Sequence, residues 1–162
     1  WLLIGMIGGI GNSMILGNFD STFAAHPEMA LYIPLIGGTG GNVGTQSSAI
    51  IVQGLANSSL DAKNTFKQIT KESVVALINA TIISLLVYTY NFIRFGATAT
   101  VTYSVSISLI AVVMFASIFG TLVPMTLEKF KIDPAIATGP FIAITNDIIG
   151  MMLYMGITVL LS

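Results

Sequence analysis

The stretch Pro34–Gln46 places glycines, amides and hydroxyls inside an otherwise hydrophobic part of the sequence, where it reads PLIGGTGGNVGTQ. Asn42, Gln46 and Gln53 share one helical stripe because they are four and seven residues apart. At membrane depth, polar side chains and loosely bonded backbone groups are tolerated only where they face protein or water. The stretch therefore predicts one wall of a polar pathway through a bilayer.

The same glycines have a second interpretation. Gly37 and Gly41 are four residues apart, and so are Gly40 and Gly44. This small-xxx-small spacing is typical of helices that pack closely in membranes. The sequence alone leaves both interpretations open.

Asp147 is the only acidic residue placed well inside a hydrophobic run. An ionised carboxylate there costs at least ~2.5–3.5 kcal/mol, so a functional role is the default interpretation. Pro140 is expected inside the same helix, where it would free the carbonyl of Ile136. Asp147 is thus the predicted second wall. A structural role, with Asp147 protonated or hydrogen-bonded by Asn79 or Gln46, is the alternative.

The predicted ligands of this pathway are all oxygen atoms. They come from the Asp147 carboxylate, the Asn42 and Gln46 amides, and backbone carbonyls of the glycine stretch such as that of Gly41, while the small residue Ala143 shares the face of Asp147. Oxygen ligands alone favour a hard cation such as Mg²⁺, Ca²⁺ or Mn²⁺. A single carboxylate suits Mg²⁺, which keeps several of its waters. The only histidine, in the sequence HPEM, is expected on the surface and not as a ligand.

The composition is that of an integral membrane protein. Hydrophobic residues make up 54% of the chain and charged residues 8%, compared with about 25% in soluble domains. The net charge of -1 argues against nucleic acid as a partner, and the lack of cysteine excludes a thiolate metal site. Because the sequence starts directly in an apolar run, we expect that an N-terminal part is missing.

The fold class is expected to be all-α, a single polytopic domain over residues 1–162 with five transmembrane helices. The fourth helix is expected to end near Pro124, and Asp133 with Pro134 signals the start of the fifth. Asp61 is a candidate cap of a short helix in the polar connector 57–72. The predicted spans are approximately Trp1–Phe19, Ala30–Ala56, Ser73–Phe92, Thr102–Met125 and Pro134–Leu161.

The lysines set the expected topology. The connectors after the second and fourth spans hold Lys63, Lys67, Lys71, Lys129 and Lys131. The positive-inside rule then predicts a multi-pass protein of the plasma or inner membrane with a cytosolic N-terminus and a C-terminus outside. The first three lysines are either solvated flanks of a span or a contact for anionic lipid or a cytosolic regulatory domain.

Two motifs resemble the transmembrane domain of the MgtE magnesium channel family. They are GGNVGTQ at residues 40–46 and GPFIAITNDIIG at residues 139–150. The resemblance implies that Asp147 is the ion-site aspartate and that Ala143 belongs to the P-x-x-A segment. It also implies that Asp20 replaces the usual Glu at the end of the first helix. Gly139 stands where the family often has Asn.

The resemblance further implies a homodimer with a pore along its two-fold axis, lined by the second and fifth helices. The expected function is a magnesium-selective channel that passes hydrated divalent cations, Mg²⁺ and also Mn²⁺ or Co²⁺. Family members usually carry cytosolic N-terminal and CBS domains, and such a regulatory domain is expected to be missing from this sequence. Membrane lipid is the other expected partner.

Three other functions stay open at this level. A transporter or exporter of divalent cations coupled to Na⁺ or H⁺ would use the same carboxylate. An intramembrane enzyme is disfavoured, because the sequence contains neither HExxH nor G-x-S-x-G. A purely structural membrane subunit would bind no ion.

Overall fold

The computed structural model describes residues 1–61, 64–137 and 139–162. The described residues form helices and connecting turns without any strand, in agreement with the expected all-α class. Lys63 lies outside the described residues. The elements are α1 (Leu2–Gly17), α2 (Asp20–Ala25), η1 (Pro27–Tyr32), α3 (Ile33–Ala56), α4 (Thr65–Phe95), α5 (Thr100–Lys129), η3 (Pro134–Ala137) and α6 (Pro140–Leu161).

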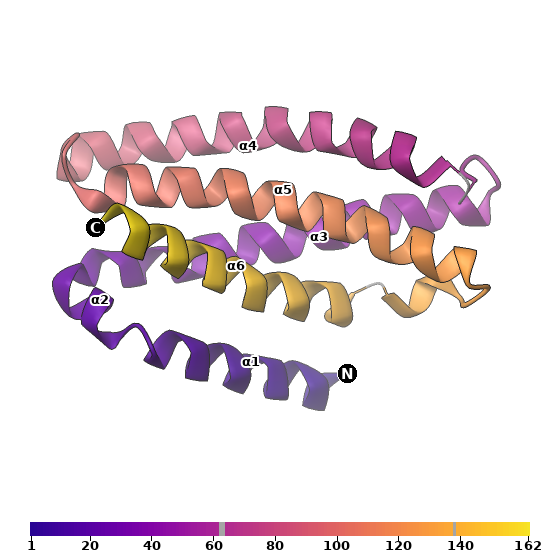
Figure 1. Cartoon of the computed structure of the whole chain (residues 1–162), viewed down its shortest axis with the longest axis horizontal. Helices are drawn as coiled ribbons and strands as arrows, with labels where there is room; N and C mark the ends of the chain where they lie inside the picture. The colour runs from indigo at the N-terminus through magenta and orange to yellow at the C-terminus, as the bar shows by residue number, and fades with distance from the viewer. Residues whose placement is uncertain (62–63, 138) are drawn as a thin grey trace.

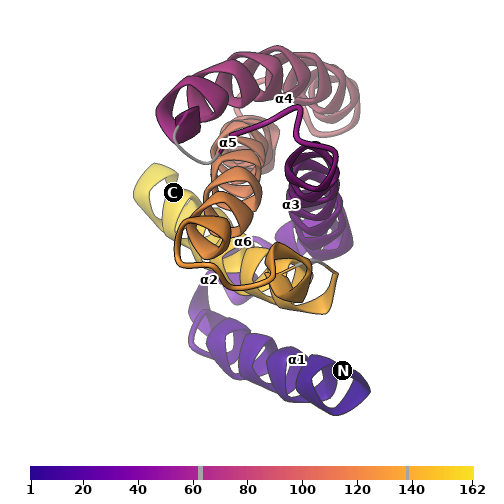
Figure 2. The ribbon, with the colours of Figure 1, turned by 90° about the vertical axis from the view of Figure 1, so that its right-hand side faces the viewer.

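The long helices run back and forth along one axis of the molecule (Figure 1). Helix α5 is central, because it packs against α3, α4 and α6, and α3 also packs directly against α6. Helix α1 lies at the edge and packs on α6, as the end-on view shows (Figure 2). Helix α6 therefore lies between α1 and the rest of the bundle.

Apolar side chains from three helices and η1 fill the centre. Leu109 and Val112 of α5 pack with Ile36 of α3 and with Met151 of α6, and all four are almost completely buried. Buried hydroxyls tie the segment before α3 to this core. The Tyr154 hydroxyl donates a hydrogen bond to the Met29 carbonyl at 2.8 Å. The Tyr32 hydroxyl, at the end of η1, donates one to the Asn91 side-chain oxygen.

In the described part of the chain, three helices are long and apolar enough to cross a membrane, namely α4, α5 and α6. Helix α1 is apolar but has only 16 residues. Large apolar side chains of α4 point outward, among them Val74, Ile78, Ile82 and Leu85, which are all at least half exposed. Such a face suits contact with lipid, and the architecture is that of a membrane protein.

Several expected helix ends were wrong. Helix α1 ends at Gly17, before the expected Phe19, and Asp20 begins a separate short helix. Helix α4 begins at Thr65, so the last part of the polar connector is helical, and its N-cap residue is Asn64. Polar and charged side chains at 65–72 fit a helix that extends past the apolar span.

Helix α5 also continues beyond its expected end. It passes through Pro124 and ends at Lys129. A proline inside a helix removes one backbone hydrogen bond. Pro124 and Met125 are nevertheless buried, and the packing of this turn holds the helix together across the missing bond.

The expected position of Pro140 inside a helix was wrong. Gly139 has φ +67, a left-handed conformation that favours glycine, and it is the N-cap residue of α6. The helical conformation is therefore interrupted between η3 and α6. Pro140 is then the first residue of α6, where a missing N–H removes no helical hydrogen bond. The predicted release of the Ile136 carbonyl by a kink therefore does not apply.

The glycine-rich stretch was expected to carry loose backbone, and this expectation was wrong as well. Helix α3 is a continuous α-helix from Ile33 to Ala56. Its glycines serve close packing on one side. A Cβ on Gly40 would lie 2.9 Å from a methyl carbon of Val112, and a Cβ on Gly44 would overlap the Asn146 amide. On α5, a Cβ on Gly120 would overlap the carbonyl oxygen of Gly44.

We expect Gly120→Ala to destabilise the bundle by about 1–3 kcal/mol. The added methyl group would clash with the backbone carbonyl of Gly44, which cannot move aside as a side chain can by changing its rotamer. The thermal midpoint of the purified protein in detergent measures the effect. The matched control is Gly156→Ala in α6, where a Cβ would meet nothing within 4 Å. Equal midpoints for the two variants would contradict the α3–α5 contact described above.

Candidate functional site

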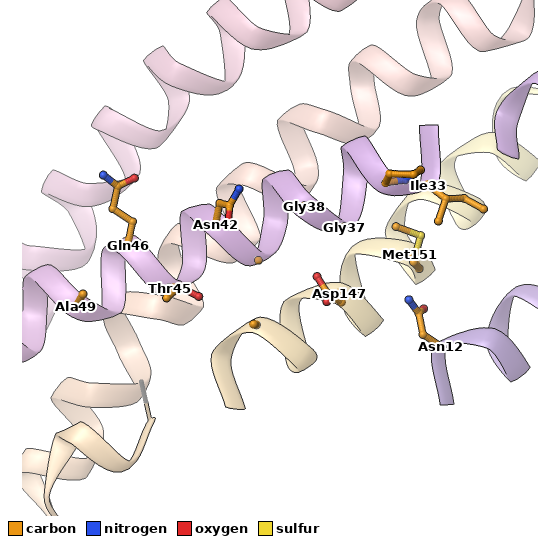
Figure 3. A pocket seen from close by; sticks show the side chains of 13 residues that line it. Asn12, Ile33, Gly37, Gly38, Asn42, Thr45, Gln46, Ala49, Asp147 and Met151 are labelled. Atoms are coloured by element: carbon orange, nitrogen blue, oxygen red, sulfur yellow. The ribbon is translucent and has the colours of Figure 1, made fainter. Parts of the chain in front are cut away.

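A groove of about 720 Å³ runs along α3 and α6 (Figure 3). Five of the six residues that the sequence singled out line it, namely Gly41, Asn42, Gln46, Ala143 and Asp147. The other lining residues are Asn12, Ile33, Pro34, Gly37, Gly38, Thr45, Ala49 and Met151. The sequence motifs on two separate helices thus meet at one concave surface.

Asp147 lies one third of the way along α6 and faces the glycines of α3. A Cβ on Gly41 would lie 3.1 Å from Oδ1 of Asp147 and 4.0 Å from Cβ of Ala143. A Cβ on Gly37, one turn earlier, would lie 3.7 Å from the same carboxylate oxygen. The absent side chains let the carboxylate lie directly against the α3 backbone, so these two glycines shape the site, whereas Gly40 and Gly44 serve packing.

The Asp147 carboxylate has no hydrogen bond to any other described residue. The structural alternative, in which Asn79 or Gln46 satisfies the acid, is not what the structure shows. Asn79 lines a separate pocket of about 150 Å³ between α3, α4 and α5, together with Glu72. Asp147 is half-buried and points toward α3 near Gly37 (Figure 3).

The amides of the GGNVGTQ motif lie differently. Asn42 and Gln46 line the groove but project from the side of α3 that faces away from Asp147 (Figure 3). Both are exposed in the single chain. Gln46 also lines the neighbouring pocket that contains Glu72. Within one chain, the two amides and the carboxylate do not converge on a single point.

The sixth predicted residue, Asp20, is not among those that line the groove. It is the exposed first residue of α2, in the segment that connects α1 to η1. His26 lies near the surface as expected, and its Nδ1 is 3.7 Å from a carboxylate oxygen of Glu28. Neither residue belongs to the α3–α6 groove.

Asn12 is a lining residue that sequence reasoning missed. It comes from α1 and lines both the groove and an adjoining pocket of about 80 Å³ that it shares with Asp147. Its side-chain oxygen is buried without a hydrogen-bond partner among the described residues. The signal that would have found it is an amide in the middle of an apolar helix, since polar groups at that depth mark functional positions.

Asn146, next to the carboxylate in sequence, is the second missed amide. It is 1% exposed, and neither atom of its amide has a hydrogen-bond partner among the described residues. A buried amide without a partner costs about 1–3 kcal/mol. The free-energy cost of the unpaired Asn146 amide therefore falls on the same turn of α6 that carries Asp147.

The groove has a negative electrostatic character. Among the described residues, Asp147 is the only ionisable one that lines it, and none of the described lysine, arginine or histidine side chains does. The described residues contain no cluster of three or more His, Cys, Asp or Glu side chains. One chain thus offers a single carboxylate with neutral oxygen donors around it. This set suits a hard cation that keeps most of its waters.

Comparison with known proteins identifies relatives of this chain. Residues 33–157 match the model of the MgtE family, which is described as a divalent cation transporter. The chain is similar to the magnesium transporter MgtE of Thermus thermophilus, with 32% identity over 161 residues that cover 99% of this chain and 35% of the relative. The MgtE of Bacillus subtilis is 31% identical over 157 residues, covering 97% and 35% of the two chains.

A further relative is the magnesium transporter MgtE of Enterococcus faecalis. It is 28% identical over 160 residues, which cover 97% of this chain and 34% of the relative. The chain thus spans about a third of the length of the curated relatives it matches. Helix α1, with Asn12, precedes the residues that the family model covers but lies within these pairwise matches.

We expect Gly41→Ala to weaken divalent cation binding about tenfold, because the methyl group would push the Asp147 carboxylate away from α3 and small displacements of a ligand are costly. The measurement is the Mg²⁺ concentration that half-saturates the thermal stabilisation of the purified protein. Gly37→Ala is the control, since its Cβ would sit at ordinary contact distance, 3.7 Å from the same oxygen. A larger effect at Gly37 than at Gly41 would contradict the assigned geometry.

Proposed function

The chain belongs to the MgtE family of divalent cation transporters, and from this we propose that it forms the pore of a magnesium channel. The proposed cargo is a hydrated Mg²⁺ ion, which passes along the α3–α6 groove and is attracted by Asp147. Mn²⁺ and Co²⁺, of similar size and ligand preference, are secondary cargoes. The proposed location is the plasma or inner membrane.

The observation that carries this proposal is the environment of the Asp147 carboxylate. It is half-buried in a candidate membrane span, lies against glycine backbone, and has no hydrogen bond to a described residue. Keeping an ionised group at such a depth costs at least ~2.5–3.5 kcal/mol. A cation that visits the groove offsets this cost, whereas a purely structural acid would be paired within the protein.

The groove is large enough for an ion with its water shell. Mg²⁺ prefers octahedral coordination and loses water reluctantly. About six waters at about 30 Å³ each occupy about 180 Å³. The groove measures about 720 Å³, so a hydrated ion fits with room to move along it. Outer-shell contacts from Asp147, the Ala143 carbonyl and the α3 amides would then guide the ion.

A second copy of the chain completes the proposed pore. The groove-lining residues of α3 that are exposed in the single chain are Pro34, Gly38, Asn42, Gln46 and Ala49. This polar stripe would otherwise meet lipid, which cannot satisfy its amides. A homodimer with its two-fold axis along the groove would cover both stripes and bring two Asp147 carboxylates to one pathway. The paired charge favours divalent over monovalent cations.

The alternating directions of the long helices support five spans (Figure 1). Lys67 and Lys71 near the start of α4, and Lys129 and Lys131 at the end of α5, lie at one end of the bundle (Figure 1). The positive-inside rule assigns this end to the cytosol. The N-terminus is then cytosolic and the C-terminus outside. An inward-negative potential drives entry by ~2.3 kcal/mol per charge per 100 mV, and a divalent ion feels twice that.

We expect Asp147→Asn to abolish Mg²⁺ uptake into liposomes, because the amide keeps the shape of the side chain and removes its charge. Uptake is measured with an entrapped Mg²⁺ indicator under an imposed membrane potential. Glu128→Gln is the control, since Glu128 is exposed at the end of α5. Uptake at the wild-type rate in Asp147→Asn would refute the proposal, and uptake that requires a Na⁺ or proton gradient would replace the channel with a coupled transporter.

We expect Ala49→Cys to form a disulfide between two copies of the chain under mild oxidation. The chain has no native cysteine, so every crosslink reports the introduced one. Ala49 is exposed at the groove, whereas the control Ile78→Cys lies on the outward apolar face of α4 and should stay monomeric on a denaturing gel. Crosslinking of Ile78→Cys alone would place the interface elsewhere.

A further inference from the structure

A second polar cavity, of about 400 Å³, lies at the end of the bundle where α3 turns into α4. Its charged lining residues are Lys67 and Lys71 of α4 and Asp61 of the preceding turn. Ser59, Asn64 and Gln68 add polar side chains, and its floor is apolar. In the part of the chain that the structure describes, the cavity shares no lining residue with the α3–α6 groove.

The charge of this cavity favours an anion. Lys67 and Lys71 are one helical turn apart, so both ammonium groups extend over the same surface. The described residues hold one ion pair within 4 Å, between His26 and Glu28, so neither lysine is paired with a described acid. Among the described residues that line the cavity, two lysines against the one carboxylate of Asp61 leave an excess positive charge.

The nearest acid on the same helix, Glu72, accepts a hydrogen bond from another residue and is not paired with a described lysine. Glu72 follows Lys71 in α4, and its Oε1 accepts a hydrogen bond from the Gln68 amide at 3.1 Å. Gln68 is 9% exposed and lines the inner part of the lysine cavity, so its amide lies between the cavity and the Glu72 carboxylate. The carboxylate of Glu72 lines the pocket on the α3 side and not the lysine cavity. The Glu72 carboxylate is thus held by Gln68 and lines the pocket toward α3, whereas Lys67 and Lys71 line the cavity.

The position of the cavity indicates the source of the anion. Val74 and Ile78, within two turns of Lys71, begin the exposed apolar face of α4. On the other side of the lysines, Phe66 is 84% exposed. Aromatic and basic side chains at the end of an apolar span mark the depth of the lipid headgroups. A ligand held here would have its charged part at the lysines and its apolar part along α4.

We propose that this cavity binds the phosphate-bearing headgroup of an anionic phospholipid, with the acyl chains lying on the exposed face of α4. Basic pockets at the cytosolic ends of membrane helices are suited to such headgroups. Ser59 and Asn64 offer polar groups to the phosphate and the glycerol hydroxyls, and Leu60 and Met125 form the apolar floor.

The test is lipid retention measured by native mass spectrometry of the protein in detergent with added phosphatidylglycerol or phosphatidylcholine. We expect preferential retention of phosphatidylglycerol. Lys67→Gln and Lys71→Gln should each weaken it about fivefold, and the double variant about twenty-five-fold. Glutamine keeps helix propensity close to that of lysine, so α4 should remain intact. The double variant Lys67→Arg/Lys71→Arg should keep the retention.

The matched control is Lys129→Gln/Lys131→Gln, which removes two exposed lysines at the same end of the bundle. An equal loss of lipid in this control would overturn the proposal in favour of a diffuse surface charge effect. Unchanged retention in Lys67→Gln/Lys71→Gln would also overturn it. Displacement of the lipid by millimolar inorganic phosphate would also overturn the proposal and make the cavity a site for soluble phosphate.

Discussion

The close approach of α3 and α6 is the constraint on which the rest of the structure depends. Two α3 glycines make it feasible, because a methyl group on Gly44 would meet the Asn146 amide and one on Gly41 would meet the Asp147 carboxylate. Without this approach the acid of α6 would stand away from α3 and lie against lipid. A charge at that depth is tolerable only in a polar cleft, so helix packing and ion chemistry are coupled through the same few atoms.

Other parts of the fold hold this pair of helices in place. Helix α5 supports both from behind, and Gly120 lets it approach the α3 backbone at Gly44. The Tyr154 hydroxyl bonds the Met29 carbonyl and so joins α6 to the segment that leads into α3. Helix α1 covers the remaining side of α6 and contributes Asn12. The result is a packed back wall formed by α5 and α1 and an exposed front that carries the amides of Asn42 and Gln46.

Much of this was predictable from the residues. The hydrophobic composition implied helices in a membrane. Asp147 and the GGNVGTQ motif implied a polar pathway, because polar and ionisable side chains at membrane depth are costly and are kept mainly for function. The family of the chain followed from the same two motifs. Local rules failed where packing overrides them. Pro124 predicts a helix end, yet α5 continues to Lys129 because the turn around Pro124 is buried and packed. Pro140 reads as a kink, yet the left-handed Gly139 makes it a helix start.

The sequence by itself determined the helical class, the membrane environment and the carboxylate that can attract a cation, since these depend on residue types and their periodicity. Only the tertiary structure decided which glycines pack and which face Asp147, that Asn42 and Gln46 project away from the carboxylate, and that Asn12 joins the groove. The physical reason is that the rotation of each helix about its axis is set by contacts between segments far apart in the chain. Periodicity shows that a face exists, but only packing shows what that face meets.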